Sequence, residues 1–219
     1  MMQTSSKEVM RTDELIRGLS GQAGRKAPAA VSPDRALGLS LVLSLLIALL
    51  VIIGIPGLRP GLPEWLMTWS FQFKVATMTL FAGGGAILVR AAGIPGMTLK
   101  PLLAVLPGVL LLFIGILFDR SGFPLLGARQ MSVPLCVGAI IMASLPGLAL
   151  IMAGLRRGIP TRLTAAGATA GFLSGSIGAL AYTIACVNDG AMFVAIWYMV
   201  AIFITTAIGA VAGRYVLAW

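Results

Sequence analysis

The sequence contains no histidine and few charged residues. Of its 219 residues only 11% are charged, and Asp and Glu together number seven. The absence of histidine excludes imidazole metal sites and histidine-based acid–base chemistry, and so few carboxylates leave almost no material for a catalytic cluster. We therefore expect neither enzymatic activity nor a cofactor. Two cysteines are too few for a disulfide framework, although they suffice for one bridge.

Apolar residues are correspondingly abundant. They make up 58% of the chain, against roughly 45–50% in soluble domains, which excludes a water-soluble enzyme and a disordered chain. A membrane-spanning helix needs about 20 mostly apolar residues, and six stretches qualify. They are Leu37–Ile55, Phe71–Val89, Pro101–Phe118, Val133–Gly154, Ala165–Cys186 and Met192–Ala212. The sequence thus predicts an all-α integral membrane protein with six transmembrane helices.

Basic residues are distributed unequally between the two sides of this topology. Twelve Lys and Arg flank the spans on the side of both termini, and three, Arg59, Arg120 and Arg129, lie on the other. Because cytoplasmic loops carry the excess of positive charge, we expect both termini in the cytoplasm. The net charge of +9 follows from this topology. It does not indicate direct nucleic-acid binding, since no basic run is interleaved with aromatic residues.

The first 35 residues are the only sizeable segment outside the membrane domain, which we place at residues 36–219. A short amphipathic helix is predicted there from a capping residue, two acidic residues in the first turn and an apolar stripe: Thr12, Asp13, Glu14, Leu15, Ile16 and Leu19. So short a helix needs a partner to be stable. A protein groove and the membrane surface are alternatives, as is a frayed tail with accidental periodicity.

Polar and small residues within the spans are few. Lys74 is the only ionisable residue inside a predicted span. We expect its stem to extend to the headgroups, the alternative being a substrate or proton path. No Asp or Glu lies mid-span, which argues against a proton-coupled transporter. Glycines at four-residue spacing predict close helix packing in spans five and six: Gly167, Gly171, Gly175, Gly209 and Gly213.

The two prolines of repeated Leu-Pro-Gly triplets, Pro107 and Pro146, lie about two turns deep in spans three and four. Proline kinks a helix, so the pair predicts a hinge or a coincidence of position.

The two cysteines lie at similar depth in the predicted topology. Cys136 is near the outer start of span four, and Cys186 is at the outer end of span five. Three interpretations stay open: two unrelated buried small side chains, a structural disulfide, or a thiol pair that responds to oxidants or to soft metal ions.

Several segments together resemble a known family. They are Thr12–Ile16, Leu155–Arg162 between spans four and five, and the run from Cys186 to Tyr198, followed by Gly213-Arg214 and Trp219. On these segments the chain resembles the NrsF-like membrane anti-sigma factors of proteobacteria, which restrain sigma factors of the extracytoplasmic-function class.

The resemblance implies a multi-pass protein of the bacterial inner membrane, with the sigma factor and the lipid bilayer as partners. It implies that the N-terminal segment holds the sigma factor away from RNA polymerase. It also implies that Cys136 and Cys186 face the periplasm as the signal-sensing pair, for an oxidant or for a heavy-metal ion bound transiently. The alternative function is a small six-span transporter or channel subunit.

Overall fold

The computed structural model describes residues 12, 14–18, 20, 33–94, 100–119, 122–127, 131–158 and 160–218. The chain divides into two compact units, Met1–Ser32 and Pro33–Trp219. Every regular element among the described residues is helical, which confirms the predicted all-α class.

The described residues of the first unit, 12, 14–18 and 20, are helical and exposed. Leu15 and Ile16 leave 63% and 55% of their surface exposed, and the hydroxyl of Ser20 donates a hydrogen bond to the carbonyl of Arg17 (3.0 Å). Asp13 and Leu19, which belong to the predicted helix, lie outside the described residues. The apolar side chains of this helix thus have no covering within their own unit among the residues described.

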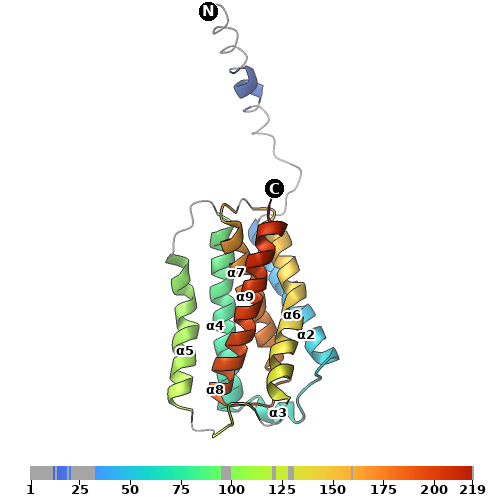
Figure 1. Ribbon diagram of the computed structural model, residues 1–219, viewed down its shortest axis with the longest axis vertical. Helices are drawn as coiled ribbons and strands as arrows, with labels where there is room; N and C mark the ends of the chain where they lie inside the picture. The colour runs from blue at the N-terminus through green and yellow to red at the C-terminus, as the bar shows by residue number, and fades with distance from the viewer. Residues whose placement is uncertain are drawn as a thin grey trace, which may run out of the picture. The chain divides into compact units, whose positions relative to one another are not determined.

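The second unit is a bundle of helices (Figure 1). Its elements are α2 (Pro33–Gly54), α3 (Leu62–Trp65), α4 (Trp69–Ala92), the 3₁₀ helix η1 (Lys100–Val105), α5 (Leu106–Leu117), α6 (Ser132–Leu155), α7 (Leu163–Tyr182), α8 (Ala191–Phe193), the π-helical turn η2 (Val194–Tyr198) and α9 (Met199–Val216). The short helices α3 and α8 lie at one end of the bundle, and the C-terminus lies at the other.

Five of these helical segments are long and apolar enough to cross a membrane: Asp34–Gly54, Trp69–Ala92, Ser132–Leu155, Leu163–Tyr182 and Ala191–Val216. They correspond to five of the six predicted spans. The remaining predicted span corresponds to the shorter apolar helix Pro101–Leu117. Its first residues are wound as the 3₁₀ helix η1, which rises about 2.0 Å per residue instead of 1.5 Å. That winding lengthens the segment, and the sixth span stays a prediction.

Helix α7 lies at the centre of the bundle and packs against α2, α4, α6 and α9. Its small residues allow the neighbouring backbones to approach. A Cβ atom on Gly171 would lie 2.8 Å from the Cα atom of Thr206 in α9, and one on Gly85 of α4 would lie 3.1 Å from the Cα atom of Leu173. Side chains at these positions would force the helices apart. The Gly83–Gly85 run is continuous helix in α4.

The two prolines differ in their positions. Pro146 lies inside α6, whereas Pro107 lies in the first turn of α5, directly after η1. Pro107 therefore marks the junction of the 3₁₀ helix and α5 within the apolar helix Pro101–Leu117, and the hinge expected from the two prolines stays a prediction.

Candidate functional site around Cys136 and Cys186

Three ionisable side chains meet in the interior of the second unit. Asp189 lies in the connection between α7 and α8. It forms one ion pair with Lys74 of α4 (Nζ to Oδ1, 2.6 Å) and another with Arg59, which lies between α2 and α3 (Nη1 to Oδ2, 2.8 Å). Arg59, Lys74 and Asp189 are 8%, 0% and 7% exposed. We refer to them as the Asp189 cluster. It joins three parts of the chain that are far apart in the sequence.

The same two cations also bind the backbone around Cys186. The guanidinium of Arg59 donates to the carbonyl of Cys186 (3.3 Å), and the ammonium of Lys74 donates to that of Asn188 (3.3 Å). The backbone N–H of Arg59 donates to the carbonyl of Ile184 (3.1 Å). Residues 186–190 have no regular structure, and carbonyl groups of buried irregular backbone require donors from elsewhere in the protein. Arg59 and Lys74 supply them.

This arrangement corrects the expectation for Lys74. Its side chain is fully buried and ends on Asp189, so it does not extend to the lipid headgroups. A buried ammonium needs a charged partner, and a carboxylate from a connection between helices satisfies that need without any acidic residue inside a span. No acidic residue lies mid-span, as expected, but the interior does hold one buried carboxylate, that of Asp189.

Cys136 lies in the second turn of α6, and Cys186 follows α7; both are buried free thiols. Both cysteines belong to the same buried apolar core. The sulfur of Cys186 donates a weak hydrogen bond to the carbonyl of Asn188 (3.5 Å). That carbonyl also accepts from Lys74. Cys186 and the Asp189 cluster therefore form one continuous site.

Two tyrosines line the same site. The rings of Tyr182 and Tyr198 are tilted against each other with centroids 5.9 Å apart, and both side chains are buried in the same core as the two cysteines. Tyr198 ends the π-helical turn η2 and is completely buried. Among the described residues, its hydroxyl has no hydrogen-bond partner. Turns of π-helix occur frequently at functional sites.

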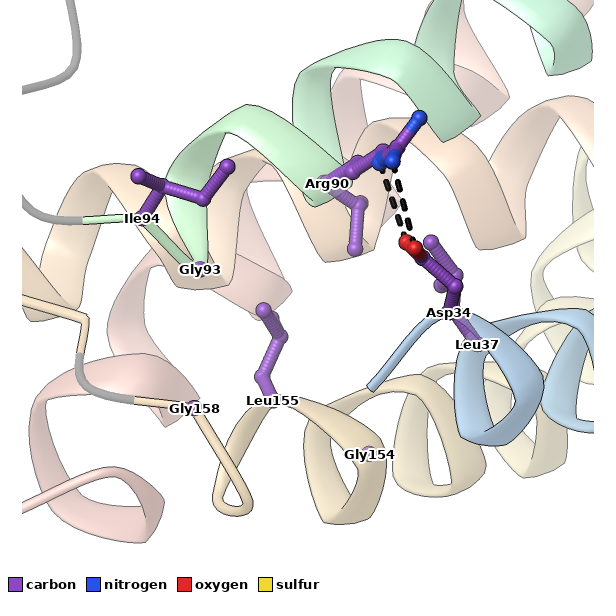
Figure 2. A pocket seen from close by; sticks show the side chains of 9 residues that line it. Asp34, Leu37, Arg90, Gly93, Ile94, Gly154, Leu155 and Gly158 are labelled. Carbon is purple, nitrogen blue, oxygen red and sulfur yellow. Dashed lines mark hydrogen bonds and ion pairs between the residues drawn. The ribbon is translucent and has the colours of Figure 1, made fainter. Parts of the chain in front are cut away.

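A pocket of about 280 Å³ lies elsewhere in the second unit, where α2 begins and α4 and α6 end. Asp34 and Arg90 form an ion pair across it (Nε to Oδ1, 3.0 Å), as Figure 2 shows, with Leu155 projecting into the space between the helices. Both charged side chains are about two-thirds exposed, at 66% and 65%. This ion pair is the exposed counterpart of the buried Asp189 cluster.

The comparison with protein families decides where this architecture belongs. The family model NrsF, negative regulator of sigma F, matches residues 20–219. The chain belongs to the NrsF family. The probable anti-sigma-F factor NrsF of Azospira oryzae is 28% identical over 226 residues, covering 96% of this chain and all of that protein. The anti-sigma-F factor NrsF of Caulobacter vibrioides is 31% identical over 217 residues, with the same coverage of both chains. No solved structure matches.

Within this NrsF chain the predicted site residues fall into two groups. Thr12, Glu14, Leu15 and Ile16 belong to the first unit, and the cysteines to the second. Cys136 and Cys186 both lie in the buried core of the second unit. The predicted packing glycines lie where α7 meets α9.

Arg59, Asp189 and Tyr198 belong to the site but were not predicted from the sequence as its members. One signal was available: a lysine inside a span requires a carboxylate, and only seven acidic residues exist in the chain.

Proposed function

We propose that this NrsF chain is an anti-sigma factor of the bacterial inner membrane, with both termini in the cytoplasm. Its N-terminal segment binds a sigma factor of the extracytoplasmic-function class and keeps it from RNA polymerase. Family membership supports a regulatory role. The observation that carries the binding assignment is the exposed apolar pair Leu15 and Ile16, on a helix too short to be stable without a partner.

The binding step is tested with the full-length protein in membranes. Leu15→Asp together with Ile16→Asp is expected to abolish co-purification of the sigma factor and to raise transcription from its promoters. The matched control is Arg17→Gln, which changes a similarly exposed residue of the same helix. Equal recovery of the sigma factor from the double variant and the control would overturn the assignment.

Deleting residues 1–20 separates this function from that of a small transporter or channel subunit. An anti-sigma factor loses its activity with the segment, whereas a transporter is expected to keep its flux. The membrane domain has to be shown by immunoblot to remain at its normal level.

We propose further that Cys136 and Cys186 receive the signal from the periplasmic side, either as an oxidant or as a soft metal ion. Both thiols are buried, and Cys136 lies on α6 whereas Cys186 follows α7, which supports this role. A bond between them would change how α6 and α7 pack, and that change would be transmitted to the cytoplasmic side. Reversing occupancy from 99:1 to 1:99 requires about 5.5 kcal/mol. A disulfide contributes about 2–4 kcal/mol, so much of the required free energy is available from thiol chemistry.

The sensing step is tested with Cys136→Ser and Cys186→Ser. Each variant is expected to retain the sigma factor and to lose its release by a thiol oxidant or by a soft divalent metal. A response that persists in both single variants and in the double variant would overturn the assignment. Comparing the two stimuli in the wild-type protein identifies which class of signal acts.

A further inference from the structure

We propose that Arg59 and Lys74 are positioning residues for the thiol pair: through Asp189 and the carbonyl groups beside it, they hold the Cys186 segment against α6, where Cys136 lies. This inference deepens the proposed function and rests on the sensing role of the two cysteines given there.

Contacts from two basic side chains converge on one short segment around Cys186. The side chains of Arg59 and Lys74 bind two carbonyl groups, those of Cys186 and Asn188, and both bind the carboxylate of Asp189. The backbone of Arg59 adds a bond to Ile184. The N–H of Cys186 still donates to the carbonyl of Tyr182 at the end of α7 (3.0 Å), whereas the residues that follow it have no regular structure. Loss of the contacts with Arg59 and Lys74 therefore loosens this segment rather than a whole helix.

Lys74 is also linked to the sulfur of Cys186 through a shared carbonyl oxygen. Lys74 Nζ and Cys186 Sγ bind the same oxygen atom, the carbonyl of Asn188, at 3.3 and 3.5 Å. A shift of Lys74 therefore changes the orientation of the thiol directly. Cys136 differs in this respect, because it lies within the regular helix α6, whereas Cys186 lies where regular structure ends after α7, with its N–H bonded to the carbonyl of Tyr182.

The Asp189 cluster holds two positive charges and one negative charge. One carboxylate serves two cations, so removing either cation leaves a neutral ion pair, whereas neutralising Asp189 leaves two buried positive charges without a partner. Removing one member of a buried pair is costly when the other stays charged. The structure thus predicts a graded series in which Asp189→Asn loosens the Cys186 segment most, and Lys74→Met and Arg59→Met loosen it less.

The experiment measures alkylation of each cysteine by N-ethylmaleimide in the full-length protein in membrane vesicles, with the two modified peptides separated by mass spectrometry. In Asp189→Asn, alkylation of Cys186 is expected to accelerate about tenfold or more while that of Cys136 changes less than about twofold. Lys74→Met is expected to give an intermediate acceleration, and Lys74→Arg, which keeps the charge, to behave like the wild type. The matched control is Asp34→Asn, which removes the acidic partner of the exposed ion pair with Arg90.

Three results would overturn the proposal: unchanged alkylation of Cys186 in Asp189→Asn, parallel acceleration at both cysteines, or equal effects of Lys74→Arg and Lys74→Met. Parallel acceleration would show general unfolding. If Asp189→Asn does not accumulate in the membrane, the alkylation rate of Cys186 in Lys74→Met tests the proposal, since this variant keeps the ion pair between Arg59 and Asp189.

Retention and release of the sigma factor are measured in the same vesicles. Selective exposure of Cys186 without any oxidant- or metal-driven release in the wild type would support the positioning role and refute the sensing function. Normal release of the sigma factor in the wild type, with no change in the alkylation of Cys186 in the variants, would support the sensing function and refute the positioning role.

Discussion

Gly167 of α7 and Gly213 of α9 lie so close together that a Cβ atom on Gly213 would be 2.8 Å from the Cα atom of Gly167. One turn along, a Cβ atom on Gly209 would be 2.8 Å from the Cα atom of Gly171. The two helices therefore meet backbone to backbone over successive turns. In a membrane, where burial of apolar side chains between helices gains little over contact with lipid, such close packing is a main source of helix association.

Gly209→Ala and Gly213→Ala are accordingly expected to destabilise the bundle, each by about 1–3 kcal/mol. The added methyl group would meet backbone atoms, which cannot rotate away as a side chain can. The measurement is the midpoint of thermal unfolding in detergent, followed by loss of the monodisperse peak.

The control for this pair is Gly138→Ala in α6, where a Cβ atom would meet nothing within 4 Å. Alanine favours a helix over glycine by about 1 kcal/mol, so the control is expected to be neutral or stabilising. An equal loss of stability at Gly138 and Gly213 would contradict the packing argument.

The existence of the long helices could be predicted from the sequence because an apolar run of membrane-spanning length permits few other structures. The spacing of Gly167, Gly171 and Gly175 indicates a close helix contact. It does not name the partner, since several helices carry glycine. The division of one span into η1 and α5 has no counterpart in hydropathy, because a 3₁₀ turn and an α-turn are equally apolar.

The Asp189 cluster could not be predicted from periodicity. Its ion pairs join residues 115 and 130 positions apart, and neither the spacing of apolar residues nor the count of basic residues specifies which loops meet. A basic residue such as Arg59 contributes to the predicted orientation of the chain whether or not it is buried. Counting basic residues therefore does not predict its ion pair with Asp189. Lys74 was misassigned for the same reason: long-range pairing decided its environment, and the length of its stem did not.

The buried and exposed ion pairs are expected to differ sharply in their contribution to stability. Asp34→Asn removes an exposed pair, and we expect a loss of about 0–1 kcal/mol. Asp189→Asn leaves two buried cations, and we expect a loss of about 3–5 kcal/mol. Urea or thermal denaturation of the two variants side by side measures the difference. Similar losses for both would show that water reaches the Asp189 cluster.

The indole of Trp197 donates a hydrogen bond to the carbonyl of Leu125 (2.8 Å) and ties η2 to the segment of residues 122–127. Trp197→Phe keeps an aromatic ring and removes this donor, so we expect faster amide hydrogen exchange in residues 122–127 and little change elsewhere. The total loss of stability is expected to be about 1 kcal/mol. Exchange that accelerates throughout α9 would show that the indole serves packing of the bundle instead.

Tyr198 carries a buried hydroxyl without a hydrogen-bond partner among the described residues. Leaving such a group unsatisfied costs about 1–3 kcal/mol, so Tyr198→Phe is expected to raise the unfolding midpoint. Tyr215→Phe, at a residue of α9 that is 75% exposed, is the matched control and is expected to change stability by less than about 0.5 kcal/mol.

A buried hydroxyl that lowers the stability of the resting protein is suited to a second conformation of the protein in which it gains a hydrogen-bond acceptor. We therefore expect Tyr198→Phe to retain the sigma factor and to respond more weakly to the thiol-directed signal, measured as reporter output against signal dose. A stabilised variant with an unchanged dose response would leave the hydroxyl without a role in signalling. A destabilised variant would show that the hydroxyl is already hydrogen-bonded in the resting protein.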